Sequence, residues 1–314
     1  MFFLSQKNLV GIDIGQMMTK IAYKNKEYAV ETPEGAVGRG GAPNPSILGE
    51  RLKQAVSNNG LAKKFAVISY NGQGVFTKSI QVPKNLKLGE INNYIKLQKD
   101  NILPFGTEDS VMDFIQLGSD DNHQNILVLA LKQKSVYPYY EAAKIAGLRP
   151  KAVDIPALAL KRKYFDKEKL KGLQLIVDVG ERSTNIHIYK EKQFRFSRSI
   201  SVGGGDFGAV ASAAKEMTAK EGKDEKVPLT SPALADVFYH LQRELNRSIE
   251  YFRYRNGKQE LSSFTLAYIT GGYGKTPGID KVFAQSLDIS LESIISDDSK
   301  YSLAQGLTMW GDGK

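Results

Sequence analysis

Two turns with the pattern Asp-x-Gly stand out among the residues that could do chemistry. In Leu9–Tyr23 a run of apolar residues ends at Asp13, and Gly15 opens a turn into a second strand-forming run. Because glycine lacks a Cβ atom, the N–H groups of such a turn can surround a phosphate closely. Asp13 could hold Mg²⁺, which prefers one or two carboxylates with phosphate oxygens, and Thr19 and Lys20 would add a hydroxyl and a positive charge. A single such turn is also what an ordinary hairpin with a solvated aspartate contains.

The pattern recurs in the second part of the chain. Another apolar run ends at Asp178, and the chain turns through Gly180 and Ser183 into a new strand, 165 residues after the first aspartate. This separation is about one domain, so two similar domains can present their turns to each other and grip one polyphosphate. A third stretch, Ala267–Gly274, is an apolar strand ending in a glycine pair, where the backbone can lie against a flat base or a ribose.

These residues must be positioned by strands. Each Asp-x-Gly turn lies between two β-prone runs, which is the pattern of a hairpin. A hairpin, a second hairpin and a strand with Gly-Gly, in this order, resemble the phosphate-1, phosphate-2 and adenosine motifs of the actin, sugar-kinase and heat-shock-chaperone ATPase superfamily. The resemblance implies an α/β protein with the actin-like ATPase fold, two similar halves around a nucleotide cleft.

Composition limits the kind of protein this chain can be. Its 314 residues are 41% hydrophobic, enough for one large core or two, and cysteine is absent, which excludes a disulfide framework and fits a reducing cytoplasm. The apolar runs are shorter than the roughly 18–20 residues of a transmembrane helix. The formal charge is +9, and the segment 132–171 holds eleven Lys or Arg against four Asp or Glu. That segment could lie beside an anionic membrane or form a solvated surface, but it lacks the aromatic-interleaved pattern of basic RNA-binding strands.

A small subdomain is predicted inside the first half, at Ile80–Pro150. Its elements follow the order β-α-β-β-α-β, the ferredoxin-like arrangement. The predicted strands are Val75–Val82, Val111–Leu117, Ile126–Leu131 and Lys151–Asp154, and the helices are Leu88–Asn101 and one that starts at Ser135 and closes at Gly147. A four-stranded sheet with helices on one face leaves edges that can accept an extended peptide.

Two stretches of the second half could reach a nucleotide. Gly203–Phe207 opens a helix after a glycine-rich approach; a helix N-terminus with bare backbone suits a phosphate, and a plain loop-to-helix junction accounts for this segment equally well. Ala235–Tyr254 is the longest predicted helix, with the apolar stripe Phe238, Leu241, Leu245, Ile249 and Phe252. Glu244 and Arg247 stand off that stripe, where they would either contact a ribose or face solvent.

Two helices are predicted to connect the halves. Ile155–Phe165 leads from the first half to the second, and Asp154 before it is either a helix N-cap or a general base. The closing helix, Tyr301–Met309, contains Ala304 and Gly306, whose small size permits a close crossing with another helix.

Over nearly its whole length the sequence resembles the PilM family of type IV pilus assembly proteins. The resemblance rests on LVGIDIG and TKIAY near the start, on Leu103–Phe105 and Ala146–Leu148, and on LQRELNRSIEYF at Leu241–Phe252. The cell-division protein FtsA shares the inserted domain, called 1C, but adds a C-terminal membrane-targeting helix. A self-anchoring role is not expected here, because the chain stops just past the closing helix.

The resemblance implies an ATP-binding scaffold in the cytoplasm, peripherally associated with the inner membrane through partners. Expected partners are the cytoplasmic N-terminal peptide of a PilN-like bitopic membrane protein and other pilus assembly components; nucleic acid is not expected, and a homo-oligomer stays open. ATP and Mg²⁺ are the expected cofactors, with Asp13 and Asp178 as metal ligands. The residues expected to bind the cofactor are Asp13, Gly15, Gln16, Met17, Thr19, Lys20, Asp178, Gly180, Ser183, Gly204, Gly205, Glu244, Arg247, Gly271, Gly272 and Tyr273.

The chain departs from the family pattern at two places. Gly208 stands where relatives often place a threonine after the glycine pair, and Glu181-Arg182 is bulkier than the small residues common after the second Asp-x-Gly. Two other functions stay open, an FtsA-like filament-forming protein and a small-molecule phosphotransferase with Asp154 as its base. At most a slow ATPase is expected, with no catalytic residue assigned. The expected division is 1–79 (1A), 80–150 (1C-type insertion), 151–174 (inter-half helix), 175–205 and 262–300 (2A), 206–261 (2B) and 301–314 (closing helix).

Overall fold

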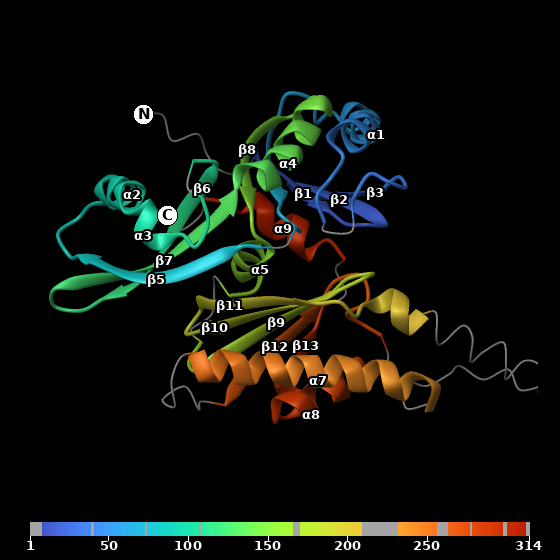
Figure 1. Ribbon diagram of the computed structural model, residues 1–314. Helices are drawn as coiled ribbons and strands as arrows, with labels where there is room; N and C mark the ends of the chain where they lie inside the picture. The colour runs from blue at the N-terminus through green and yellow to red at the C-terminus, as the bar shows by residue number, and fades with distance from the viewer. Residues whose placement is uncertain are drawn as a thin grey trace, which may run out of the picture.

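Two five-stranded sheets with the same strand order dominate the computed structural model, which describes residues 8–38, 41–72, 74–106, 108–165, 170–208, 232–255, 263–276, 278–297 and 300–311 (Figure 1). The first sheet has the order β3-β2-β1-β4-β8, built from β1 (Val10–Ile14), β2 (Met18–Tyr23), β3 (Lys26–Glu31), β4 (Phe65–Ser69) and β8 (Arg149–Asp154). The second has the order β11-β10-β9-β12-β13, built from β9 (Leu173–Val179), β10 (Thr184–Lys190), β11 (Gln193–Ile200), β12 (Phe264–Thr270) and β13 (Ile294–Ser296).

Each sheet joins an antiparallel three-strand meander to two parallel strands. In the first sheet β1 pairs antiparallel with β2 and parallel with β4; in the second, β9 pairs antiparallel with β10 and parallel with β12. Both predicted hairpins therefore form, and each places its Asp-x-Gly turn at the end of the first strand of its sheet. The two halves repeat one topology, as the spacing of the two motifs predicts.

Helices cover the outer faces of the two sheets. Helices α1 (Pro45–Asn58) and α4 (Gln133–Ile145) pack on the first sheet, and α1 begins at Asn44, whose side chain accepts the N–H groups of Ser46 and Ile47, both at 3.2 Å. On the second sheet, α7 (Pro232–Arg255) and α8 (Ile279–Leu287) lie on the face turned away from the first half (Figure 1). The predicted apolar stripe of α7 is buried there, which confirms the register of that helix. A short 3₁₀ helix, η3 (Leu291–Ser293), precedes β13.

Two crossed helices hold the halves together. Helices α5 (Pro156–Phe165) and α9 (Ser302–Thr308) lie between the sheets, in an apolar cluster that takes in Val67 of β4 and Ile176 of β9 (Figure 1). A Cβ atom on Gly306 would lie 2.1 Å from the carbonyl oxygen of Ala159, so the two helix backbones are in direct contact. The close crossing predicted from the small residues of this helix is confirmed.

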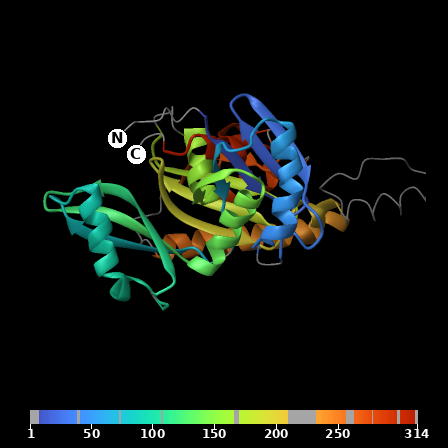
Figure 2. The same cartoon turned by 90° about the horizontal axis from the view of Figure 1, so that it is seen from above.

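The insertion in the first half is smaller than predicted. It comprises β5 (Phe76–Pro83), α2 (Leu88–Leu97), α3 (Lys99–Ile102), β6 (Ser110–Ser119) and β7 (His123–Lys132), with the sheet order β5-β7-β6. It has its own apolar core under α2 and projects to one side of the two main sheets (Figure 2). The strand predicted at Lys151–Asp154 is β8, which pairs parallel with β4 in the first sheet, and α4 packs on α1. The expected fourth strand and second helix of the insertion therefore belong to the first half, because Pro150 and its neighbours extend the sheet edge next to β4.

The structure describes only part of the second half, so some predictions for it are not tested. A helical turn begins at Gly204, as predicted, and of the segment 206–261 expected as 2B the structure describes residues 206–208 and 232–255. Among the helices that are described, none has both the length and the apolar character needed to cross a membrane.

The close contact between α5 and α9 predicts that a larger residue at position 306 destabilises the protein. We expect Gly306→Ala to lower the free energy of unfolding by about 1–3 kcal/mol, because the added methyl group overlaps the Ala159 carbonyl oxygen and forces the helices apart. The matched control is Gly89→Ala in α2, where a Cβ atom meets nothing within 4 Å, so stability should hold or rise slightly. Urea unfolding followed by circular dichroism measures both; equal midpoints for the two variants would contradict the close crossing.

Candidate functional site

The two Asp-x-Gly turns face a common cleft between the halves. The cleft has a volume of about 1420 Å³ and is lined by residues of both turns, of the glycine pair after β12 and of the base of the insertion. Of the predicted site residues, those on its walls are Asp13, Gly15, Gln16, Met17, Lys20, Asp178, Gly180, Ser183, Gly272 and Tyr273. Those that do not line it are Thr19, Gly204, Gly205, Glu244, Arg247 and Gly271.

Asp13 is the most constrained side chain of the first turn. Its carboxylate is buried, with Oδ2 at 3.2 Å from the Lys20 ammonium, and Oδ1 accepts hydrogen bonds from Ser69 Oγ at 3.3 Å and Asn71 Nδ2 at 2.9 Å. Ser69 and Asn71 were missed in the sequence. They lie at the carboxyl end of β4, which runs parallel to β1, and the meeting of parallel strand ends at one edge is the signal that could have found them.

Asp178 of the second turn is electrostatically coupled to the first. Burial raises the pKa of its carboxyl group to about 6; the nearby Asp13 charge adds to the rise, while Lys20 and a hydrogen bond from Asn185 oppose it. The pKa of Lys20 is in turn raised, chiefly by Asp13 and also by Asp178. Lys20 thus contacts the Asp13 carboxylate and interacts with Asp178, from the other half, only through its charge.

Two buried amide oxygens beside these carboxylates lack a partner. Gln16 Oε1 and Asn71 Oδ1 accept no hydrogen bond from any described residue, although both residues line the cleft. Unpaired buried polar atoms are costly, so a ligand or water that donates to them would be stabilised. A hydrated Mg²⁺ fits this donor set, since it takes one or two carboxylates and keeps several waters that can donate hydrogen bonds.

The first turn is also open to an anion. The N–H groups of Gln16 and Met17 donate to no other group within the described residues, and both line the cleft. Gly15 is required here, because a Cβ atom would lie 2.5 Å from the Met18 carbonyl oxygen. Thr19 stays behind the turn: its Oγ1 lies 2.9 Å from Thr32 Oγ1, which in turn donates to the Gly15 carbonyl oxygen at 2.9 Å. Thr19 therefore supports the turn from the core side.

The backbone N–H groups around the second turn already donate hydrogen bonds within the protein. The N–H groups of Gly204 and Gly205, predicted to meet phosphates, donate to the carbonyl oxygens of Gly180 and Glu181, both at 2.8 Å. The N–H of Tyr273 donates to the Val179 carbonyl oxygen at 3.1 Å. Gly271 adopts a φ of +93°, and a Cβ atom there would lie 2.4 Å from Asp178 Oδ1, so the glycine pair packs against the aspartate.

Glu244 and Arg247, the predicted ribose contacts, lie on α7 but do not line the cleft. Glu244 Oε1 is 2.8 Å from Arg247 Nη1, and Glu244 Oε2 is 3.2 Å from Arg198 Nη2 of β11. The α7 residues that do line the cleft are Tyr251 and Arg255, two and three turns nearer the end of the helix. The ribose role of Glu244 and Arg247 stays a prediction that their position does not support.

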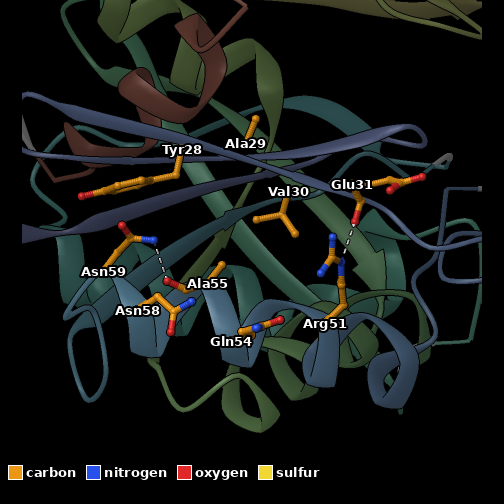
Figure 3. A pocket seen from close by; sticks show the side chains of 9 residues that line it. All are labelled: Tyr28, Ala29, Val30, Glu31, Arg51, Gln54, Ala55, Asn58 and Asn59. Carbon is orange, nitrogen blue, oxygen red and sulfur yellow. Dashed lines mark hydrogen bonds between the residues drawn. The ribbon is translucent and has the colours of Figure 1, made fainter.

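A smaller hollow of about 350 Å³ lies between β3 and α1 (Figure 3). Its walls are Tyr28–Glu31 on one side and Arg51, Gln54 and Asn58 among others on the other, and Arg51 Nε donates to the Glu31 carbonyl oxygen at 3.4 Å. None of the predicted site residues lines it. The cleft between the turns is therefore the candidate site.

Comparisons with known proteins identify the family and the fold of this chain. The family model described as type IV pilus assembly protein PilM matches residues 7–308. Among solved structures, a PilM-PilN type IV pilus biogenesis complex aligns with a TM-score of 0.74 at 22% identity, covering 97% of this chain and 98% of that one. MreB5 of Spiroplasma citri bound to ADP gives 0.53 at 12% identity (98% and 97%), and the ethanolamine utilization protein EutJ of Carboxydothermus hydrogenoformans gives 0.50 at 11% (96% and 89%). The predicted actin-like ATPase fold is confirmed.

The raised pKa of Asp178 predicts a pH-dependent stability. Between its ordinary value near 3.8 and about 6, the folded chain binds more protons at this group than the unfolded chain, so the contribution of Asp178 to stability falls as pH rises through that window. Asp178→Asn cannot ionise, so its stability relative to wild type should rise by on the order of 2 kcal/mol from pH 4 to pH 7.

Urea unfolding at a series of pH values measures this difference. The control is Asp121→Asn in the exposed turn between β6 and β7, for which the difference from wild type should stay constant. If the difference in stability between Asp178→Asn and wild type is also constant with pH, the pKa of Asp178 is not raised by folding, which contradicts this prediction.

Proposed function

The chain belongs to the PilM family of type IV pilus assembly proteins, and on that premise we propose that it is a scaffold that binds ATP with Mg²⁺ in the cleft and holds a membrane-protein peptide on its insertion. The observation that carries the first part is a group of three charges: the Asp13 carboxylate contacts the Lys20 ammonium, and Asp178, from the opposite half, interacts with both through its charge. A divalent cation with phosphate oxygens is the ligand that relieves two crowded carboxylates and uses a nearby ammonium.

The residues of the first turn would hold the phosphate end of the nucleotide. Asp13, with Asp178 opposite, would bind the Mg²⁺; Gln16 Oε1 and Asn71 Oδ1 would accept hydrogen bonds from its waters; and the Gln16 and Met17 N–H groups would face phosphate oxygens. When bound, the metal neutralises phosphate charge. Lys20 supplies a second positive charge at the same place.

The contacts of Asp154 argue against its role as the general base of a phosphotransferase. The Asp154 carboxylate is in contact with the Arg162 guanidinium, and its Oδ1 accepts the N–H of the next residue, Ile155, at 2.9 Å, which is not the bond to N2 or N3 that a helix N-cap makes. A carboxylate bound in this way holds α5 in place rather than accepting a proton from a substrate. We therefore propose at most slow ATP hydrolysis, with binding as the main event.

The partner peptide is proposed to lie along the free edge of β5. The register of β5 with β7, continued by the hydrogen bond from Lys84 N–H to the Asn122 carbonyl oxygen, points the backbone groups of Thr77, Ser79 and Gln81 away from β7. The Arg255 guanidinium reaches the Thr77 carbonyl oxygen at 3.4 Å, which agrees with that direction. An extended peptide can pair with such an edge by strand addition.

The groove beside this edge suits apolar side chains. Phe76 of β5, Pro156 of α5, and Phe194 and Phe196 of β11 line the outer end of the cleft, where the insertion meets the first half and the two halves meet. The PilM-PilN complex shows a relative bound to a PilN protein. We propose the cytoplasmic N-terminus of a PilN-like bitopic protein as the occupant, which would hold this chain at the inner membrane; other pilus components and a homo-oligomer stay open.

The ATP proposal predicts a metal-dependent affinity that rests on the first turn. Wild type should bind Mg²⁺-ATP by titration calorimetry, Asp13→Asn should lose the Mg²⁺-dependent part, and Lys20→Gln should bind about tenfold more weakly, a loss of ~1.4 kcal/mol. Lys26→Gln on the exposed side of β3 is the matched control and should bind as wild type does. No heat and no thermal shift with wild type at any ATP concentration would refute the proposal, because saturation at about 100 times Kd adds roughly 2.7 kcal/mol of stability.

The peptide proposal predicts a strand-edge effect at Ser79. Ser79→Pro should weaken binding of the PilN-like peptide at least about tenfold, because proline has no N–H to pair with an added strand, while leaving the bonds to β7 intact. Ser79→Ala keeps the N–H and should bind as wild type does. Fluorescence anisotropy of the labelled peptide measures all three; equal affinity for the proline variant, with an unchanged melting temperature, would place the peptide elsewhere.

A further inference from the structure

The second phosphate turn is filled by two side chains of the chain itself. A Cβ atom on Gly204 would lie 1.8 Å from Tyr273 Cγ, so the tyrosine ring lies flat on the bare face of that glycine. A Cβ atom on Gly205 would lie 2.6 Å from Glu181 Oε1. The Tyr273 hydroxyl donates a hydrogen bond to Glu181 Oε2, which closes the pair over both glycines.

Both side chains directly follow a glycine-containing motif. Glu181 directly follows the second Asp-x-Gly, and Tyr273 directly follows the glycine pair of β12. Both line the cleft, so the ring and the carboxylate occupy space on the wall opposite the first turn. Glu181 also adds a carboxylate to a cleft that already holds those of Asp13 and Asp178. A phosphate chain entering the cleft would meet this carboxylate before it met the glycines.

The backbone under the pair is fixed, which limits how the pair can open. The Tyr273 N–H donates to Val179, and the Tyr273 carbonyl oxygen accepts from the N–H of Thr276 at 3.0 Å and from its hydroxyl at 2.8 Å. On the other side, Gly205 donates to the Glu181 carbonyl oxygen. Opening therefore needs rotation of the two side chains and the loss of one hydrogen bond, with the loops left in place.

We propose that Tyr273 and Glu181 form a latch that sets the nucleotide affinity of the cleft: closed, they cover Gly204 and Gly205, and a nucleotide binds fully only to the open form. This rests on the proposed ATP site and adds to it a residue pair that determines affinity. The observed affinity of such a site is the intrinsic affinity multiplied by the fraction of molecules in which the latch is open. Weakening the latch must then tighten binding, the opposite of what loss of a ligand contact does.

The test compares variants that loosen the latch to different degrees. Tyr273→Ala removes the ring and the hydrogen bond, and Tyr273→Phe removes only the hydrogen bond and preserves packing. Calorimetry with Mg²⁺-ATP should give a Kd at least about fivefold lower for the alanine variant and a smaller decrease for the phenylalanine variant. Stopped-flow binding of a fluorescent ATP analogue should show the gain as a faster association rate. Tyr239→Ala, an exposed tyrosine of α7, is the matched control and should leave both values unchanged.

Each outcome decides between the latch and the ATP site itself. If wild type binds ATP and both Tyr273 variants bind equally well or more weakly, the latch is refuted and the ATP site stands. If wild type binds no ATP, the proposed function is refuted for the natural chain, and binding by Tyr273→Ala alone would then support the latch without it. If no protein in the series binds ATP, both the latch and the ATP site are refuted. Thermal unfolding checks that each variant is folded, and the phenylalanine variant decides the matter if the alanine variant is not.

Discussion

The rest of this structure depends on two carboxylates and one ammonium group that meet from opposite halves. Asp13 and Asp178 belong to different sheets, the Asp13 charge raises the pKa of Asp178, and Lys20, in contact with Asp13, opposes that rise. Like charges held this close disfavour their common ionised state unless a cation compensates them. The repeated sheet topology places the two turns at the same cleft, and the contact of α5 with α9 at Gly306 holds the two sheets in this arrangement.

The two turns repeat one topology but offer a ligand different surfaces. The first turn has backbone N–H groups that bond to no described residue, beside the unpaired amide oxygens of Gln16 and Asn71. At the second turn, the Gly204 and Gly205 N–H groups donate to the Gly180 and Glu181 carbonyl oxygens, and Tyr273 and Glu181 cover these glycines. Under the proposed function, ATP binding rather than rapid turnover is the main event in this cleft. The free edge of β5 lies beside the same cleft, and Arg255 of the second half donates to its Thr77 carbonyl oxygen.

The sequence predicted what depends on local pattern and missed what depends on distant contacts. The hairpins, the apolar stripe of α7 and the small residues of α9 are each readable within a few residues. Ser69 and Asn71 contact Asp13 from more than fifty positions away in the chain, so no local pattern reveals them. Lys151–Asp154 was correctly read as a strand but given to the wrong sheet, because a short strand does not encode its neighbour. Likewise, the side of α7 that Glu244 faces depends on where β11 lies.

The most direct test of this account is a crystal structure of the chain grown with Mn²⁺ and a non-hydrolysable ATP analogue. Mn²⁺ replaces Mg²⁺ among oxygen ligands, and its anomalous signal identifies it without ambiguity. The account predicts an anomalous peak between the Asp13 and Asp178 carboxylates, with the phosphates against Gly15–Met17 and the Tyr273 ring turned away from Gly204. A peak elsewhere, or a nucleotide in the hollow between β3 and α1 with the cleft unchanged, would contradict it.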